Sequence, residues 1–325
     1  MDEYGEISDK LMSLDQAVRR FVRPGSQVAL GGFTITRNPM AFVYEIARQG
    51  IRDLHLVCHS NGQALDVLIG AGCVKRLEIA YSGNGRYAPT CVRFKKAVEL
   101  GDVEFEDYSN FQMGLRFLAG ALDLPFMPVK SGLGSDLINR KGFSRKVRRE
   151  SGVAPKKCAL IQNPFSKDDD RVILVPALTP DLVVLHAQYV GDDGTVRIKG
   201  LTFADVEQAK AASAVVVTCE QIVPKSSIRL DPDQNTLPPF LVDAVVKAPF
   251  GAHPTGCYGF YDYDPLYLNL YKNAALDDDR YRRYLDEWVY GVGSHEQYLK
   301  KIGEKRLAEI KADPVLGYTP GLERK

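Results

Sequence analysis

The sequence has almost no excess of charge of either sign. Against 41 Asp and Glu residues stand 42 Lys and Arg residues, which leaves a formal net charge of +1 over 325 residues. A protein that binds nucleic acid needs a basic face, and the densest basic cluster, residues 144–150 (SRKVRRE), is short. Such a cluster is typical of a solvated helix face. The charge balance therefore argues against a nucleic-acid partner.

Long apolar runs and closely paired cysteines are also missing. No window of 18 uncharged apolar residues occurs, which argues against a transmembrane helix, and the first ten residues (MDEYGEISDK) lack the apolar core of a signal peptide. The cysteines show no C-x-x-C spacing and are typical of free thiols in a reducing compartment; they are Cys58, Cys73, Cys91, Cys158, Cys219 and Cys257. We expect a cytoplasmic protein without a metal site and without membrane contact.

Strand-like and helix-like segments alternate from about residue 27 to residue 130. This alternation is typical of a parallel sheet with helices on both faces. Strands are expected to resume with RVILVPAL and DLVVLHAQYV, and the turn GDDG at 191–194 predicts a hairpin. We predict an α/β fold with an open parallel or mixed sheet in a single domain over 1–325. A surface excursion is expected at 131–170, and a helical tail from about residue 265.

Residues 28–39 (VALGGFTITRNP) hold the strongest local signal, a strand that runs into two glycines and then into a helix start. Neither the dinucleotide fingerprint G-x-G-x-x-G nor the phosphate loop G-x-x-x-x-G-K-[ST] is present. The amides of Gly31 and Gly32 would be open to a substrate oxygen, as in an oxyanion hole, and Arg37 could hold a carboxylate through a bidentate contact. The competing interpretation is an ordinary tight turn with Arg37 in solvent.

Residues 79–89 (IAYSGNGRYAP) contain a second strand that ends in a turn, Ser82-Gly83-Asn84-Gly85. In α/β folds, glycine-rich turns at the carboxyl ends of strands bring backbone close to a ligand. The turn contains no carboxylate and no histidine. It resembles a turn from an active site that lacks the catalytic side chain.

Two further residues are candidates for chemistry. His253 lies in residues 247–265, whose Gly, Pro and aromatic content predicts an ordered loop; a structural histidine is the competing interpretation. Glu220 follows a buried strand, where a raised carboxylate pKa is plausible. A glutamate in such a place more often pairs with a nearby Lys or Arg.

Several segments occur in the order expected for one family. They are GSQVALGGFTITRNP, EIARQGIRDL, EDYSN, NPF, LVVLHAQ, DGTVRIKG, VVTCEQI, VDAVVKAPFGAHPTGCYGFYDYD and LGYTPG. Over about residues 12–320 the chain resembles the A subunits of the two-chain class I CoA-transferases, in particular the glutaconate CoA-transferase group. The motif GAHP-x-x-CYG-x-YDYD is the most specific part of the resemblance.

The resemblance implies the open α/β sheet of the CoA-transferase fold and a B subunit of related fold. In this family the B subunit carries a glutamate, in a Ser-Glu-Asn-Gly-like turn, that attacks the acyl-CoA thioester. Glycine stands where that glutamate would be in this chain, at Gly83. No catalytic residue is therefore expected here, and the chain would supply pocket walls, oxyanion donors and carboxylate recognition. The implied pocket residues are Gly31, Gly32, Phe33, Ser82, Gly83 and Asn84, with Thr34 and Arg37 for the far carboxylate of the acid.

The implied reaction moves CoA from an acyl-CoA such as acetyl-CoA to a short dicarboxylate such as glutaconate or 2-hydroxyglutarate. Coenzyme A is then a substrate, no cofactor is permanently bound, and an (AB)n hetero-oligomer is expected. One alternative is the A subunit of a related two-chain acyl-CoA hydrolase or decarboxylase. Another is a non-enzymatic effector-binding domain, which would usually be joined to a helix-turn-helix; the 12 residues before the first expected helix leave no room for one.

Overall fold

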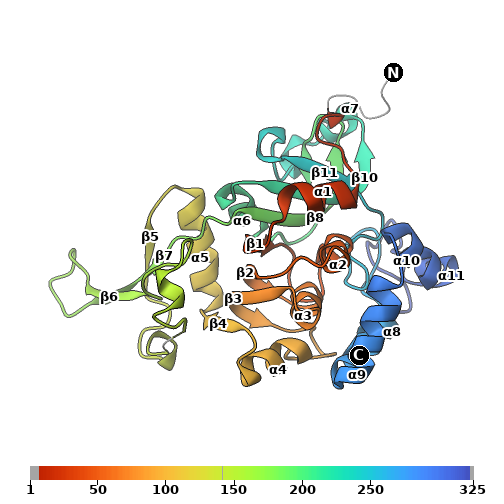
Figure 1. Ribbon diagram of the computed structural model, residues 1–325. Coiled ribbons are helices and arrows are strands. Elements are labelled where there is room, and N and C mark those ends of the chain that lie inside the picture. The colour runs from red at the N-terminus through yellow and green to blue at the C-terminus, as the bar shows by residue number, and fades with distance from the viewer. Residues whose placement is uncertain (1–6, 141, 323–325) are drawn as a thin grey trace.

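The computed structural model describes residues 7–140 and 142–322, and its centre is an eight-stranded sheet (Figure 1). The strand order is β11-β10-β8-β1-β2-β3-β4, with β9 paired to β8. All neighbours in this order are parallel, and only β9 runs antiparallel to its partner. The predicted parallel or mixed sheet is therefore confirmed, and it is parallel except for β9. Its strands are β1 (Gln27–Leu30), β2 (Leu54–Asn61), β3 (Val74–Ser82), β4 (Glu104–Asp107), β8 (Leu182–Gly191), β9 (Val196–Arg197), β10 (Val215–Val223) and β11 (Ala244–Lys247).

Helices cover both faces of this sheet, because alternate strand residues point to opposite sides. Val28 and Leu30 belong to an apolar cluster that α2 and α3 complete, whereas Ala29 belongs to a second cluster completed by α5 and α6. The helices are α1 (Leu14–Phe21), α2 (Met40–Arg48), α3 (Gln63–Gly70), α4 (Val92–Leu100), α5 (Asn110–Ala121), α6 (Asp205–Ala211), α7 (Lys225–Ile228), α8 (Pro265–Ala275), α9 (Asp278–Leu285), α10 (His295–Ile302) and α11 (Glu304–Glu309).

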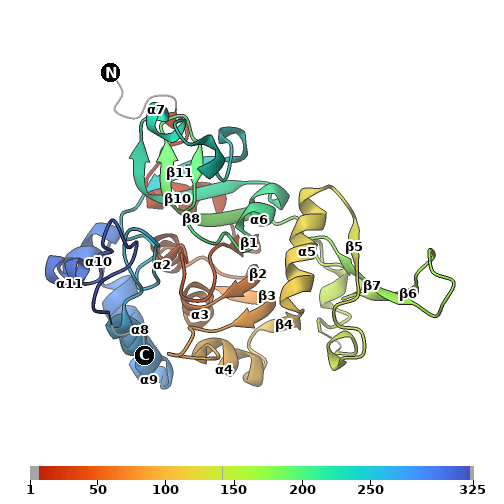
Figure 2. The same ribbon diagram turned by 180° about the vertical axis from the view of Figure 1, so that it is seen from behind.

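A second, three-stranded sheet projects from the first, as Figure 2 shows from behind. It is antiparallel, in the order β5-β7-β6, and consists of β5 (Phe126–Val129), β6 (Ala159–Gln162) and β7 (Arg171–Pro176). RVILVPAL forms a strand, as the sequence predicts, but this strand belongs to the projecting sheet and does not continue the main sheet. Strand β7 has buried and more exposed residues in alternation, while β8 is buried almost throughout. Alternation of this kind suits a sheet with one face toward water.

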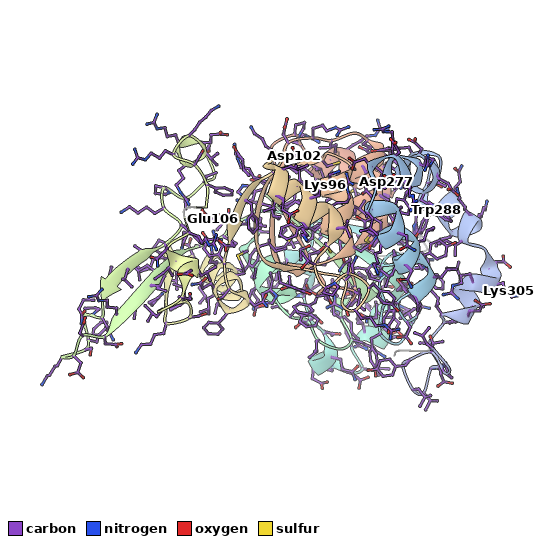
Figure 3. All side chains as sticks on the ribbon, turned by 90° about the horizontal axis from the view of Figure 1, so that it is seen from below. Lys96, Asp102, Glu106, Asp277, Trp288 and Lys305 are labelled. Carbon is purple, nitrogen blue, oxygen red and sulfur yellow. The ribbon has the colours of Figure 1, made fainter. Side chains whose placement is uncertain are left out.

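The projecting sheet packs the apolar residues Val129, Ile173 and Val175 against Leu115 of α5, and polar contacts lie beside this cluster. Glu106 of β4, labelled in Figure 3, accepts hydrogen bonds from the Tyr108 hydroxyl at 2.7 Å and from the Phe143 amide at 3.0 Å. Phe143 lies within the segment 131–170 that was expected to be an excursion. That segment contributes β6 and short 3-10 turns to the projecting part of the molecule.

The hairpin and the helical tail are where the sequence predicts them. The Gly191 amide donates to the Thr195 carbonyl at 2.7 Å and closes the turn between β8 and β9. Helix α8 begins at Pro265, with the Asp264 side chain accepting from the Leu266 and Tyr267 amides. The tail covers the α2–α3 side of the sheet, because Tyr271 and other buried residues of α8 to α10 join the same apolar cluster.

The state of the cysteines agrees with the free thiols that the sequence predicts. All six thiols are free, five of them buried and Cys158 partly exposed. Across residues 7–140 and 142–322, no helix combines the length and the apolar character needed to cross a bilayer.

Candidate active site at the carboxyl edge of the sheet

The two turns singled out in the sequence form one site, because β1, β2 and β3 are parallel and end at the same edge. The Asn61 side-chain amide donates to the Gly31 carbonyl at 3.3 Å. A methyl group at Gly62 would lie 2.3 Å from Asn84 Oδ1 and 2.6 Å from the Thr34 carbonyl oxygen. Gly62 is thus the point where both turns meet the end of β2. Gly62 was not among the predicted site residues, although Ser60-Asn61-Gly62 at the end of this strand is a comparable turn signal.

The amides of the two glycines in the first turn, residues 31–37, already have partners inside the chain. The Gly31 amide donates to the Val184 carbonyl at 2.9 Å, and the Gly32 amide donates to Asp205 Oδ1 at 2.9 Å. These hydrogen bonds contradict the prediction that both amides are open to a substrate oxygen. Gly32 has φ +77°, and a Cβ there would lie 2.4 Å from the Thr36 carbonyl oxygen. Glycine is required at this position by the path of the turn itself.

Arg37 occupies neither of the two places expected for it. Its side chain is 1% exposed and forms an ion pair with Asp205 Oδ2 at 2.8 Å. The same guanidinium donates to the Leu201 carbonyl at 2.8 Å and to the His186 carbonyl at 3.2 Å. Arg37 is therefore not in solvent, and its partners within the chain argue against the substrate-carboxylate role. Neither interpretation of Arg37 included Asp205 as its partner, because Asp205 lies 173 residues beyond Gly32 in the sequence.

Backbone strain gathers in this turn. Thr34 (φ 47°) and Arg37 (φ 50°) both lie in the left-handed region, which costs a residue other than glycine about 1–3 kcal/mol. Such residues persist where their surroundings hold them, and they gather at functional sites. The strain therefore agrees with a turn that is shaped for a purpose.

Two cavities lie near the turn, and Phe203 lines both of them. The Phe203 ring stacks on Phe33 with centroids 4.3 Å apart and an interplanar angle of 11°. One cavity of about 510 Å³ is lined by His59, Asn110, Phe111, Gly114, Leu115, Leu118, Phe203, Ala204 and Glu207. The other, of about 370 Å³, is lined by Ile35, Thr36, Gly200, Leu201, Phe203, Gly256, Tyr258, Tyr261, Asp262, Tyr263, Gly317 and Tyr318. Burial lowers the pKa of His59, which favours a neutral imidazole in the first cavity.

The second turn, residues 82–85, is held by nearby backbone. The Cys91 amide donates to the Ser82 carbonyl at 3.1 Å, and the Asn84 amide donates to the Ala88 carbonyl at 2.8 Å. Ser82 and Asn84 are both buried. A Cβ at Gly83 would lie 2.3 Å from the Tyr81 hydroxyl oxygen and 2.6 Å from the Pro89 carbonyl oxygen. A side chain at position 83 would therefore require the surrounding backbone to move.

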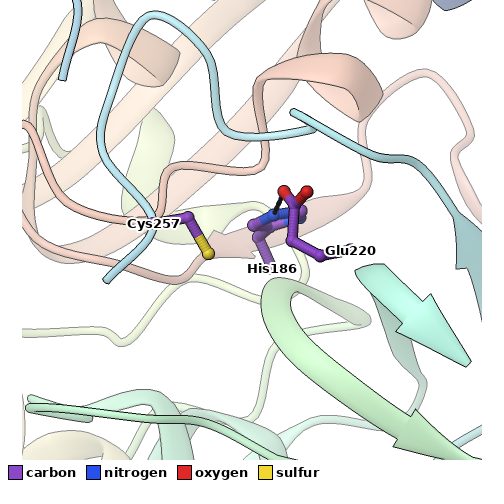
Figure 4. Close-up of side chains that lie close together, drawn as sticks. All are labelled: His186, Glu220 and Cys257. Atoms are coloured by element: carbon purple, nitrogen blue, oxygen red, sulfur yellow. Dashed lines mark hydrogen bonds and ion pairs between the residues drawn. The ribbon is translucent and has the colours of Figure 1, made fainter. Parts of the chain in front are cut away.

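Glu220 is saturated with partners and lies outside the two turns. Figure 4 shows it against His186, whose Nε2 is 2.7 Å from Glu220 Oε1. The Tyr261 hydroxyl donates to the same oxygen and the Phe250 amide to the other, each at 2.7 Å. The partner is a histidine rather than the Lys or Arg that the ordinary interpretation offered.

The side chains of His186, Glu220 and Cys257 form a group that could in principle hold a metal ion, because their potential ligand atoms lie within 4.8 Å of one another. Burial raises the pKa of the Cys257 thiol, which disfavours the thiolate that metal binding needs.

His253 has the surroundings of a structural residue. It is fully buried, and its ring nitrogens lie 2.7 Å from the Tyr298 hydroxyl and 3.1 Å from Asp264 Oδ2. Asp264 is in turn paired with Arg306 at 2.6 Å. Burial lowers the pKa of His253. These contacts tie the aromatic loop to the helical tail and favour the structural interpretation.

The structure has an open α/β sheet with glycine-rich turns at its carboxyl edge. The sequence also matches a known protein family. Residues 11–248 match the family described as Coenzyme A transferase. The chain belongs to the coenzyme A transferase family. The predicted resemblance to that family, and its fold, are confirmed.

Individual members of the coenzyme A transferase family are similar over almost the whole chain. The A subunit of glutaconate CoA-transferase from Acidaminococcus fermentans is 42% identical over 310 residues, which cover 95% of this chain and 97% of that one. The crystal structure of glutaconate coenzyme A-transferase from that organism aligns with a TM-score of 0.92 over 95% of this chain and 98% of that chain.

Two proteins with lower sequence identity to this chain differ in the reaction they are named for. The A subunit of 3-oxoadipate CoA-transferase from Pseudomonas knackmussii is 33% identical and covers 91% of this chain and 99% of that one. The structure of the decarboxylase AibA/AibB is 30% identical, with a TM-score of 0.65 over 90% of this chain and 97% of that chain. Membership of the family therefore leaves the reaction to be argued from the site.

Proposed function

We propose that this chain is the A subunit of a heteromeric CoA-transferase. It would act with a B subunit to move CoA from an acyl-CoA such as acetyl-CoA to a short dicarboxylate such as glutaconate or 2-hydroxyglutarate. The observation that carries the proposal is the second turn, whose sequence resembles the catalytic turn expected in a B subunit but which has no carboxylate and no space for a side chain at Gly83. The similarity to the A subunit of glutaconate CoA-transferase supports the same assignment.

In the proposed reaction the glutamate that the B subunit supplies attacks the thioester carbonyl, releasing CoA thiolate and leaving a mixed anhydride. The thiolate then attacks the enzyme acyl group of this anhydride, which frees the first acid and gives a glutamyl thioester. The acceptor acid repeats the two steps in reverse, so that CoA leaves on the new acid. Coenzyme A is a substrate throughout, and the expected assembly is a cytoplasmic (AB)n hetero-oligomer.

This chain would contribute a rigid wall of the reaction site. The paired turns place Phe33, Thr34, Ser82 and Asn84 at the carboxyl edge, where α/β folds bind their ligands. Thr34 remains our candidate for contact with the far carboxylate of the acid. The amides of Gly31 and Gly32 would act by holding the turn, because each already donates within the chain.

The second candidate function is an acyl-CoA decarboxylase, which the likeness to AibA/AibB favours. The two reactions differ in their products. A transferase conserves the thioester and moves it to the second acid, whereas a decarboxylase releases carbon dioxide and needs no acceptor.

The test combines this chain with a B-type partner that carries a Ser-Glu-Asn-Gly turn. Acetyl-CoA is supplied with glutaconate or 2-hydroxyglutarate, and acyl-CoA products, free CoA and carbon dioxide are measured by mass spectrometry. We expect new acyl-CoA only when both chains are present, with total thioester conserved. Turnover by this chain alone would contradict the proposal. In a separate arm the complex receives the CoA ester of glutaconate and no acceptor acid, and release of carbon dioxide in that arm would favour the decarboxylase.

A further inference from the structure

Both carboxylate oxygens of Asp205 are used on one turn. Oδ1 accepts from the Gly32 amide at 2.9 Å, and Oδ2 pairs with Arg37 at 2.8 Å. The Asp205 and Arg37 side chains are 2% and 1% exposed. Asp205 begins α6, far along the sequence from the turn it holds. One buried carboxylate therefore joins the two ends of the segment 32–37.

The residues just before Asp205 hold the same turn at two more points. The Leu201 carbonyl accepts from Arg37 at 2.8 Å, and the Phe203 ring stacks on Phe33 with centroids 4.3 Å apart. We call residues 201–205 the clamp. Phe203 of the clamp has φ 50°, so the clamp, like the turn, contains a left-handed residue that is not glycine.

The backbone conformation of the turn 31–37 needs such support. Thr34 and Arg37 are held in the left-handed region, and residues in that region keep their conformation only where the surroundings impose it. The turn also lies beside the cavities that Phe203 lines. A shift of the turn would change the wall that faces a substrate.

We propose that the Arg37–Asp205 ion pair positions the turn 31–37 for the transfer step, with Asp205 as a positioning residue that does not touch substrate. The inference rests on the proposed transferase function and adds to it a named requirement. Asparagine at position 205 would still offer an oxygen to the Gly32 amide, but its NH₂ group would face the guanidinium donors of Arg37. Asp205→Asn therefore breaks the ion pair while changing the shape of the side chain very little.

The chain offers a matched control in a second buried ion pair. Glu78, in the middle of β3, pairs with Arg116 at 2.7 Å, and their side chains are 5% and 2% exposed. Glu78→Gln, like Asp205→Asn, leaves a buried arginine without its carboxylate. Glu78 also lies 2.9 Å from His55 Nε2, and neither His55 nor Arg116 belongs to the turn 31–37. The two variants should therefore lose similar stability and differ in their effect on the turn.

The experiment uses the complex with the B-type partner and compares both variants with wild type. For Asp205→Asn we expect kcat to fall about 100-fold, as a displacement of about 1 Å can cause, with KM for the acyl-CoA within about threefold, whereas Glu78→Gln should keep its kcat. A second readout is the ¹⁹F spectrum of 4-fluorophenylalanine placed at Phe33, which should shift in Asp205→Asn and not in Glu78→Gln. This second readout needs no activity, so it tests the clamp even if wild type shows no transfer and the proposed function fails.

The variant Asp205→Asn leaves the charge of Arg37 buried without its partner and could fail to fold. A double variant, Arg37→Gln with Asp205→Asn, removes both buried charges and avoids this problem. We expect it to melt cooperatively near the wild-type temperature while kcat stays at least tenfold low, because a neutral pair holds the turn less tightly. Wild-type kcat in the double variant would overturn the proposal. So would equal loss of kcat in Asp205→Asn and Glu78→Gln, or an unchanged ¹⁹F signal in Asp205→Asn.

Discussion

The two turns at the carboxyl edge, residues 31–37 and 82–85, look alike in sequence and are held in different ways. Asp205 and Val184, which lie more than 140 residues further along the chain, bind the amides of the first turn. Backbone within ten residues closes the second turn, through bonds such as that from the Asn84 amide to the Ala88 carbonyl. A local motif of small polar residues and glycine therefore does not reveal what stabilises it.

Glycine serves a different purpose in each turn. Gly32 has φ +77°, and a Cβ there would overlap carbonyl oxygens of its own turn, the nearest at 2.4 Å. Gly85 has φ +55°, but the nearest heavy atom to its Cβ would be Ile35 Cδ1 at 3.7 Å, an ordinary contact. The first position requires the absence of a side chain, whereas the second requires only tolerance of a left-handed φ.

The largest effect is expected for Gly32→Ala. We expect it to lower the free energy of unfolding by about 3 kcal/mol, of which about 1 comes from the left-handed φ and about 2 from overlap with the Thr36 carbonyl. Urea denaturation measures this loss. The matched control is Gly101→Ala, because Gly101 has φ +75° with no atom within 4 Å of its Cβ position. Equal losses in the two variants would mean that the overlap is relieved at no cost.

An intermediate effect is expected for Gly62→Ala, at the point where the turns meet. The new methyl group would crowd Asn84 Oδ1 and the Thr34 and Gly83 carbonyl oxygens, which should cost about 2 kcal/mol of stability. Hydrogen exchange should become faster for amides in both turns. Gly114→Ala in α5 is the control, because its methyl would meet nothing closer than 3.9 Å. Faster exchange in one turn only would show that the turns are not coupled through Gly62.

The smallest effect is expected for Gly85→Ala. The left-handed φ should cost about 1 kcal/mol and nothing more, and kcat/KM of the complex should stay within about threefold of wild type. Thermal unfolding and steady-state kinetics measure the two quantities. A loss of stability as large as that of Gly32→Ala would remove the distinction between the turns.

The sequence by itself determined the features that depend on neighbouring residues. The alternation of strand and helix from residue 27, the hairpin closed between Gly191 and Thr195, the start of α8 at Pro265 and the two glycine turns can all be predicted from short windows. The family could also be recognised, because its motifs are contiguous stretches such as GAHPTGCYGFYDYD. The conformational propensities of neighbouring residues and the period of the hydrophobic pattern decide such features within short stretches of sequence.

Only the tertiary structure decided the partners of the polar groups in the site. Arg37 was expected to meet a substrate or solvent, and it meets Asp205, whose sequence context is an ordinary acid at a helix start. Strand β7 has the composition of a main-sheet strand and joins the projecting sheet instead. Hydrogen bonds and strand pairing between distant segments depend on how the whole chain packs, because a buried donor or carboxylate must find its partner wherever the fold brings one near.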